Sequence, residues 1–271
     1  MPLYSAVCPL PVNRIKNRLF DADARDYILR VEAADGQRLE SQVRSAINTF
    51  VIGCKADGIW TSLVTSCIMA GARTVAGAII PLRGNAPTNN NFVSGDYSRT
   101  LGLLGNDSNK YLATGYNNND TTNFPQNDTH ISCYVTASQT DAAGTFAGGI
   151  TLGSGARISL HYTTATQIAT RNRGLVASTI SIAPIGFQGN TRNNSANFSR
   201  RFTTSSGISE ANLTSNSFTP SSDLFGVFAA GNGSNFSNAR MSFYSIGKSL
   251  TLSSLDSRVT TLMNTLASVL P

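Results

Sequence analysis

Apolar and polar positions alternate most clearly in the carboxyl-terminal stretch of the chain, residues 238–270. Residues 239–247 predict a strand, because the side chains of a strand point alternately to its two faces. The pattern divides this strand into one face with Met241 and Phe243 and another with Ser242, Tyr244 and Ile246. We expect the strand to complete a β domain and a helix to follow it as the last element.

The last helix carries an apolar stripe at helical spacing, made of Leu255, Val259, Leu262, Met263, Leu266 and Val269. Ser253 is the predicted N-cap, because Asp256 stands three residues later, where the acid of a capping box lies. An apolar stripe of this kind must be buried against another surface of the protein or of a partner. We expect the helix to pack on its own domain or against a neighbouring subunit.

The first part of the chain predicts an extended arm and then a helical subdomain. Residues 1–20 contain Pro2, Pro9 and Pro11, which disfavour a helix. Residues 22–34 and 39–54 predict two helices with apolar faces. A third, shorter helix is predicted from Asp57, with Trp60, Leu63, Val64 and Cys67 along one face. We therefore expect an arm over residues 1–20 and an anchoring subdomain of helices over residues 21–84.

Short candidate strands recur from about residue 85 onward, separated by Gly, Asn and Ser turns. Regular short strands favour an antiparallel sandwich over a parallel sheet, and no repeat of fixed period indicates a β-helix or propeller. The predicted fold is mainly β: an antiparallel jelly-roll sandwich over residues 85–271 that ends in a helix. The candidate strands are 110–112, 130–136, 144–150, 157–163, 167–171, 179–187, 197–204, 224–230 and 240–246.

Composition places the chain among β-rich proteins with uncharged surfaces. Only 13% of its 271 residues are charged, against roughly 25% in an average globular protein, and Asn, Ser, Thr and Gly supply the polar surface. The formal net charge is +6, but the basic residues are scattered and no basic run interleaves with aromatics. We therefore expect no nucleic-acid partner. The positive net charge is compatible with an anionic polysaccharide as a partner.

The cysteines and the apolar runs predict neither a metal site nor a membrane segment. Cys8, Cys54, Cys67 and Cys133 lack metal-ligand spacing, and we expect buried thiols in a chain made in a reducing cytoplasm. Arg73 interrupts the most apolar stretch, so no transmembrane span is expected. The amino terminus has no basic region before an apolar core, so it does not predict a signal peptide.

Two segments carry a resemblance to a known family. The run Phe92-Val-Ser-Gly-Asp-Tyr-Ser-Arg-Thr-Leu-Gly-Leu-Leu-Gly-Asn-Asp-Ser-Asn-Lys-Tyr-Leu112 and the run Arg240-Met-Ser-Phe-Tyr-Ser-Ile-Gly247 with the helix after it resemble the start and end of concanavalin A-like (laminin G-like) lectin domains in bacteriophage virion proteins. The segment 46–83 resembles the helical lead-in beside such domains. The resemblance covers most of residues 24–271. It implies a jelly-roll sandwich on the outside of a virion, of the tail fibre, spike or head decoration type, and transfers no site residue.

The residues needed for hydrolysis are sparse, so we expect no enzyme. Glycanases built on this sandwich resemble one another: each carries closely spaced Glu and Asp residues on one strand. Glycoside hydrolysis needs two carboxyl groups, one as acid and one as nucleophile or base. Glutamate occurs only at Glu32, Glu40 and Glu210, none beside another acid on a predicted strand of the β domain. His130 and His161 fall in predicted strands, and no nucleophile-elbow motif accompanies them. A histidine hydrogen-bonded within a sheet is the simpler interpretation of both.

Two Asn-rich loops are the candidate glycan-binding sites, at residues 116–128 and 231–238. Amides and carboxylates can bond sugar hydroxyls, and Tyr116 or Phe124 could stack on a sugar ring. Asp120 and Asp128 could also ligate Ca²⁺, the one cofactor considered. The alternative is that both are solvated loops that only space the strands. The candidate residues are Tyr116, Asn118, Asp120, Phe124, Asp128, Asn232, Asn235 and Phe236.

These observations lead to a primary hypothesis and two alternatives. The primary one is a virion surface protein, assembled in the host cytoplasm, that binds host-surface glycans without catalysis. The second is a capsid decoration protein whose arm and helices clamp neighbouring subunits. A polysaccharide depolymerase comes third. Other virion proteins are the expected partners, together with further copies of the chain. A trimer is favoured, whose three-fold axis the last helix could line and whose avidity would strengthen weak loop contacts.

Overall fold

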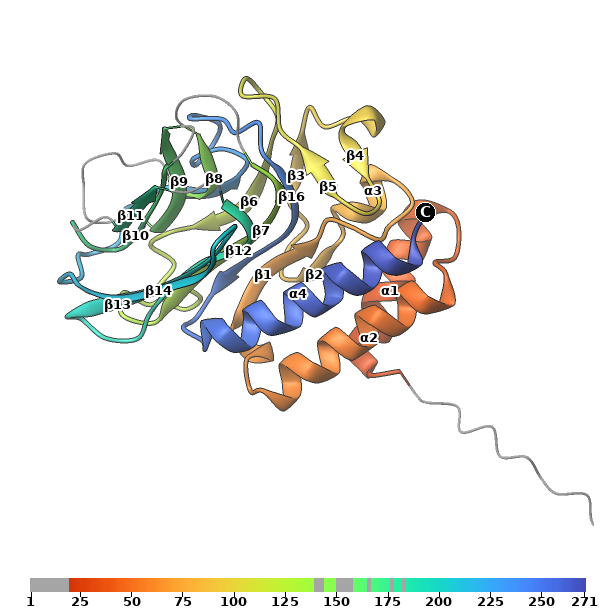
Figure 1. Ribbon diagram of the computed structural model, residues 1–271, viewed down its shortest axis with the longest axis horizontal. Coiled ribbons are helices and arrows are strands. Elements are labelled where there is room, and N and C mark those ends of the chain that lie inside the picture. The colour runs from red at the N-terminus through yellow and green to blue at the C-terminus, as the bar shows by residue number, and fades with distance from the viewer. Residues whose placement is uncertain (1–19, 139–143, 150–157, 165–166, 176–177, 182–183) are drawn as a thin grey trace, which may run out of the picture.

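The computed structural model describes residues 20–138, 144–149, 158–164, 167–175, 178–181 and 184–271. Two antiparallel sheets pack face to face, and a layer of helices covers the outer face of one of them (Figure 1). Residues 1–19 of the predicted arm, and Cys8 within them, lie outside the described residues. No helix in the described part is both long and apolar enough to cross a bilayer.

The first sheet, sheet A, has nine strands and carries the helices. Its main path runs β14-β13-β12-β7-β16-β1-β2, with β5 beside β16 and β4 beside β5. Every pairing along it is antiparallel. The strands are β1 Leu63–Ile68, β2 Pro81–Arg83, β4 Tyr97–Ser98, β5 Gly102–Leu104, β7 Thr129–Ala137, β12 Pro184–Arg192, β13 Asn197–Thr204, β14 Gly207–Thr214 and β16 Arg240–Gly247.

The second sheet, sheet B, has seven strands in the order β11-β10-β9-β8-β15-β6-β3. Its pairings are also antiparallel. The strands are β3 Thr88–Asn90, β6 Tyr111–Asn117, β8 Thr145–Gly148, β9 Ile158–Thr164, β10 Gln167–Asn172, β11 Ser178–Ser181 and β15 Leu224–Val227.

An apolar core fills the space between the two sheets. Ile131, Cys133 and Val135 of β7 all point into it, as their alternation predicts. Sheet B contributes Phe146, Leu160 and Phe225 from its side. Cys67 and Cys133 lie in this core and Cys54 in the helical layer, all three as buried free thiols. Burial raises the pKa of Cys54 and Cys67 to about 12, so neither thiol ionises near neutral pH.

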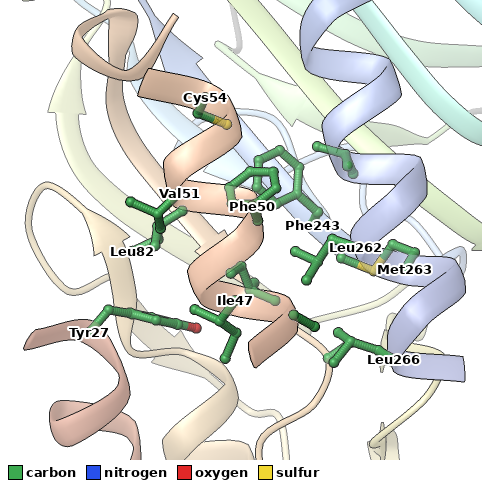
Figure 2. Close-up of a cluster of buried hydrophobic side chains, with 14 of the residues drawn as sticks. Tyr27, Ile47, Phe50, Val51, Cys54, Leu82, Phe243, Leu262, Met263 and Leu266 are labelled. Atoms are coloured by element: carbon green, nitrogen blue, oxygen red, sulfur yellow. The ribbon is translucent and has the colours of Figure 1, made fainter. Parts of the chain in front are cut away.

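A second core joins the helices to the outer face of sheet A (Figure 2). The helices are α1 Ala22–Asp35, α2 Ser41–Ala56 and α4 Leu252–Val269, with the short α3 Val75–Ala78 beside α1. Phe50 of α2 meets Phe243 of β16 edge to face at 6.0 Å between ring centres. The stripe of α4 lies against α2 and the sheet, so the prediction that it packs on its own domain is confirmed.

The predicted third helix is wrong. Residues 60–62 form a single 3-10 turn, and the next six residues form β1, paired with β16 on one side and β2 on the other. The helical spacing of these apolar residues is a coincidence: Trp60 lies in the turn, and β1 is covered on both faces, so its apolar residues Leu63, Val64 and Cys67 fall on both sides of the strand. The sandwich thus takes two strands from the segment that was expected to be helical.

Two details of the carboxyl-terminal prediction are also wrong. A β-bulge shifts the register between Met241 and Phe243, so Met241 faces sheet B while Phe243 faces the helices. The N-cap of α4 is Thr251, and its side chain makes no capping bond. Asp256 accepts instead from the Arg201 Nε at 2.6 Å and the Thr260 hydroxyl at 2.9 Å.

Replacing Phe243 with Ala is expected to lower the free energy of unfolding by about 3–5 kcal/mol, because the change leaves a cavity between sheet and helices. Leu29→Ala is the control: Leu29 is 49% exposed on α1, and its loss should cost less than about 0.5 kcal/mol. Urea unfolding followed by circular dichroism measures both. Similar small effects for the two variants would contradict the packing of helices on sheet A.

Candidate functional site

The two candidate loops lie at opposite ends of strand β6. The loop over 116–128 leaves β6 at its Asn117 end. The loop over 231–238 follows β15, whose Val227 pairs with Leu112 at the other end. Tyr111 and Tyr116 lie towards the two ends of β6, and the five residue steps between them correspond to about 17 Å. A single small ligand therefore cannot contact both loops.

Phe124, in the first loop, belongs to the core. Its ring has no exposed area and packs edge to face against Tyr116 at 5.6 Å and Phe225 at 5.1 Å. The prediction that Phe124 stacks on a sugar is therefore wrong in this conformation. Tyr116 is half-buried beside it, and its hydroxyl accepts a hydrogen bond from the Asn85 backbone N–H at 3.3 Å.

Asn118 is also buried and holds the loop to the rest of the sandwich. Its Nδ2 donates to the Ser221 hydroxyl at 3.1 Å. Its backbone carbonyl and Oδ1 both accept from Nη2 of Arg173, at 2.5 and 3.1 Å. With no exposed area, Asn118 cannot reach a sugar, which corrects that prediction.

The two aspartates of the first loop serve separate structural bonds. Asp120 accepts from the backbone N–H groups of Thr122 and Asn123 and from Asn123 Nδ2 at 2.7 Å, and these bonds lower the pKa of its carboxyl. Asp128 Oδ1 accepts from the backbone N–H and hydroxyl of Ser249, at 2.7 and 2.6 Å. In the described parts of the chain, no three acidic, His or Cys side chains gather where a cation could bind. Asp120 and Asp128, the two possible Ca²⁺ ligands, each have separate hydrogen-bond partners.

The second loop keeps its side chains accessible. Asn232 and Asn235 are exposed, and Phe236 is half-buried against Tyr111, with ring centres 5.9 Å apart and planes at 63°. A Cβ on Gly233 would lie 3.1 Å from the Tyr111 ring and 3.4 Å from the Phe236 ring. Only a residue without a side chain lets the loop approach both rings so closely, at a φ of 102°.

Backbone hydrogen bonds hold this loop in place. The Ala230 N–H donates to the Ser234 carbonyl at 2.7 Å, and the Ser234 N–H donates back to the Ala230 carbonyl at 3.2 Å. The Asn235 carbonyl accepts from the Thr145 N–H at 2.8 Å, which ties the loop to β8. Asn235 itself has a left-handed φ of 46°, a conformation that asparagine tolerates better than most residues. The loop is therefore ordered before any ligand arrives.

Two further asparagines, absent from the predicted site, lie at the same end of β6. Asn90 pairs with Tyr111 in the sheet, and the neighbouring Asn91 donates through Nδ2 to the Asn109 carbonyl at 2.9 Å. Asn91 and Asn109 are both exposed. In the sequence, Asn91 stands in the run Asn89-Asn90-Asn91, which indicates a loop rather than a site, and no pattern marks Asn109. We call Asn91, Asn109, Tyr111, Asn232, Asn235 and Phe236 the asparagine rim.

Two of the residues considered for catalysis, His130 and Glu210, have structural partners. His130 is buried, with Nδ1 2.5 Å from the Lys248 carbonyl and Nε2 2.8 Å from the Ser245 hydroxyl. Because a carbonyl only accepts, Nδ1 carries the proton and Nε2 accepts from the serine. His161 lies in β9. Glu210 forms an ion pair with Arg201, whose Nε donates to Asp256.

Comparisons with known proteins support the fold and give no family. No protein-family model and no curated protein matches the sequence. Among solved structures, a Trypanosoma rangeli sialidase mutant with trans-sialidase activity is similar over 83% of this chain and 39% of its own, with a TM-score of 0.50 and 12% identity. The binding domain of botulinum neurotoxin serotype D is similar over 74% of this chain, with a TM-score of 0.47 and 10% identity.

A further structure of the serotype D ligand-binding domain, in complex with N-acetylneuraminic acid, is similar over 77% of this chain, with a TM-score of 0.47 and 8% identity. The chain spans about half the length of these neurotoxin domains, 50% and 52%. The predicted architecture, a mainly β antiparallel two-sheet sandwich with N-terminal helices and a C-terminal helix, is confirmed.

His130 makes folding stability depend on pH. Burial lowers its pKa from 6.5 to about 4, so the folded chain excludes a proton that the unfolded chain binds below pH 6.5. Stability is therefore lost as the pH falls from about 6.5 towards 4. Between pH 6.5 and 5 the protein should lose about 1.5 kcal/mol more than a His130→Gln variant, measured by urea unfolding at each pH. Equal losses in both proteins would contradict this assignment.

Proposed function

We propose that the chain is a carbohydrate-binding module that binds host-surface glycans at the asparagine rim without catalysis. The observation that carries the proposal is the partly exposed Tyr111–Phe236 pair, which exposed asparagines flank and an ordered loop holds. The rim combines the two kinds of group that sugar recognition uses: an aromatic surface for the apolar C–H groups and amides for the hydroxyls.

The amides of the rim suit hydroxyl groups because each offers two donors and one acceptor oxygen. Asn232 and Asn235 lie on either side of Gly233, which rests on both aromatic rings. Since backbone bonds fix the loop, little conformational entropy is lost on binding, which favours a small and weak ligand such as a sugar unit. None of the six rim residues is charged, and the neighbouring Lys110 forms an ion pair with Asp96, so binding at the rim should change little with salt.

The positions of the acids support binding rather than hydrolysis. Glycoside hydrolysis needs two carboxyl groups facing the same bond, one of them as a proton donor. Glu210 and Asp256 come close together, but Arg201 lies between them and bonds both. Glu40 bonds Arg73 and Arg99 in the helical layer, and Glu32 lies 3.4 Å from Arg44 there. None of these carboxylates belongs to the rim.

A Phe236→Ala variant should lose glycan binding by tenfold or more, because half of the aromatic surface disappears. Asn119→Ala, an exposed change in the other loop, should bind as the wild type does. A glycan array of bacterial surface polysaccharides, with each variant's thermal unfolding measured alongside, gives both results. No binding by wild type, or equal binding by both variants, would overturn the assignment of the rim. Release of new reducing ends from a bound polysaccharide would overturn the non-catalytic part.

We place the module on the outside of a bacteriophage particle, in a tail fibre or spike, because the sequence resembles lectin-like domains of virion proteins. Cryo-electron microscopy of particles tests this location. Density at the tail tip or on a protruding fibre, with the asparagine rim outermost, is the expected result. Density on the capsid lattice would assign the chain to head decoration instead. A particle without the chain would overturn both locations.

A further inference from the structure

The charged residues of helices α2 and α4 are all neutralised within the chain. Each of these helices has two charged residues, whereas α1, in the same layer, has six among its 14 residues. A helix face in contact with water usually carries charged side chains, as α1 does. The four ion pairs are Arg44 with Glu32, Lys55 with Asp21 and Asp23, Asp256 with Arg201, and Arg258 with Asp57.

The outward face of α2 and α4 is made of short, uncharged side chains. The exposed residues of the two helices are Ser, Thr, Ala, Asn and Gln, with Ile52 as the exception. Ile52 lies on α2 and is 47% exposed. The cores of protein–protein interfaces are likewise depleted of charged residues. The composition of this face is therefore that of an interface.

A groove of about 300 Å³ lies between the two helices on this face. Thr49 of α2 and Thr261 of α4, both exposed, are among the residues that line it. Phe50 and Leu262 also line it, and both belong to the core between helices and sheet (Figure 2). An aliphatic side chain entering the groove would therefore meet apolar side chains of the core.

The groove and a side chain that could fill such a groove lie next to each other on one surface. Ser45, Thr49 and Ile52 follow one another along α2 at spacings of four and three residues, so they share one face of the helix. Ser45 and Thr49 line the groove, and Ile52 projects beside it. A projection and a groove on the same patch are what a two-fold contact between identical chains requires, because each chain then supplies both.

We propose that two copies of the chain pair through α2 and α4 about a two-fold axis, with Ile52 of each copy in the groove of the other. Helices of 16 and 18 residues, each about 10 Å wide, present an outline of roughly 500 Å². Side chains in relief give this outline a larger accessible area, close to the roughly 800 Å² that each partner buries in a standard interface. The face is thus large enough for a stable dimer.

The charges of the face favour a second copy as the partner. In a two-fold contact each face meets its own charge pattern, so an unpaired charge near the axis would meet a like charge. α2 and α4 avoid this because Arg258 is paired with Asp57, and the other three charged residues also have partners in their own chain.

Pairing through the helices leaves the asparagine rim accessible. The helices cover the face of sheet A that points away from sheet B, whereas Tyr111 of the rim lies in β6 of sheet B (Figure 1). A dimer therefore carries two rims, and two weak sites on one particle bind a repetitive surface more tightly than one. The pairing itself does not depend on glycan binding at the rim.

The first test is sedimentation equilibrium of the full chain across micromolar concentrations. The expected result is a reversible equilibrium between one chain and two. A monomer at every concentration would overturn the proposal. A trimer, the assembly that the sequence favours, would overturn it as well, because a three-fold contact does not bring each Ile52 into the groove of the copy that fills its own.

The second test locates the contact with a charge placed on the face. Thr49→Arg should weaken the dimer by about 100-fold or more, because each copy brings an unpaired charge into the contact. Leu29→Arg adds the same side chain at a position of α1 that is 49% exposed, and it should pair as the wild type does. Circular dichroism checks that both variants fold. Equal dimerisation of the two variants would overturn the assignment of the face.

Ile52 is tested by shortening it. Ile52→Ala should weaken the dimer by about tenfold or more, since two aliphatic side chains per dimer are lost from the contact. Ile52→Leu, which keeps the volume, should pair nearly as the wild type does. Sedimentation equilibrium of the full-length variants gives both dissociation constants. An Ile52→Ala variant that pairs as tightly as the wild type would contradict the insertion of Ile52 into the groove.

Discussion

Strand β16 must be buried on both faces, and the rest of the structure follows from that constraint. It lies between β7 and β1 in sheet A, with Tyr244 and Ile246 in the core between the sheets and Phe243 under the helices. A sheet covered on one side only would leave Phe243 and its neighbours in water. The helical layer is therefore part of the same fold as the sandwich, because its apolar stripes and the outer face of sheet A cover each other (Figure 2).

The sequence predicted elements with one clear period and failed where a segment had none. The stripe of α4 is buried in one core on one face of the helix, and Ile131, Cys133 and Val135 are buried in one core on one face of β7. Each segment therefore shows a single, regular period. β1 is covered on both sides, so its apolar residues fall on both faces of the strand and do not alternate, and their spacing resembled that of a helix. β14 was not predicted at all. It is an edge strand whose side chains are mostly solvent-exposed, so selection for apolar positions is weak there.

For the candidate site, the composition of the sequence predicted only that two loops are rich in asparagine. Asparagine-rich loops are typical of both sugar-binding sites and solvated turns, and burial decides between the two. Asn118 is buried because Arg173, 55 residues away, needs its oxygens, and Phe124 is buried against Phe225 of a distant strand. Contacts at such separations leave no local pattern. The second loop differs because its ends bond to β8 and to itself, so its asparagine side chains stay free of the core.

The buried arginines also change what the net charge means. Of the charges behind the formal +6, those of Arg173, Arg192 and Arg200 are inside the sandwich. None of the three has a carboxylate partner among the described residues; Arg200 bonds Ser178 and Ser209. A guanidinium with little or no exposed area cannot contact a phosphate, so these three arginines add nothing to a basic surface patch. The surface thus has fewer basic contact groups than the composition indicates. A surface of that kind favours an uncharged, hydroxyl-rich ligand over the phosphates of nucleic acid, because it recognises through hydrogen bonds rather than charge.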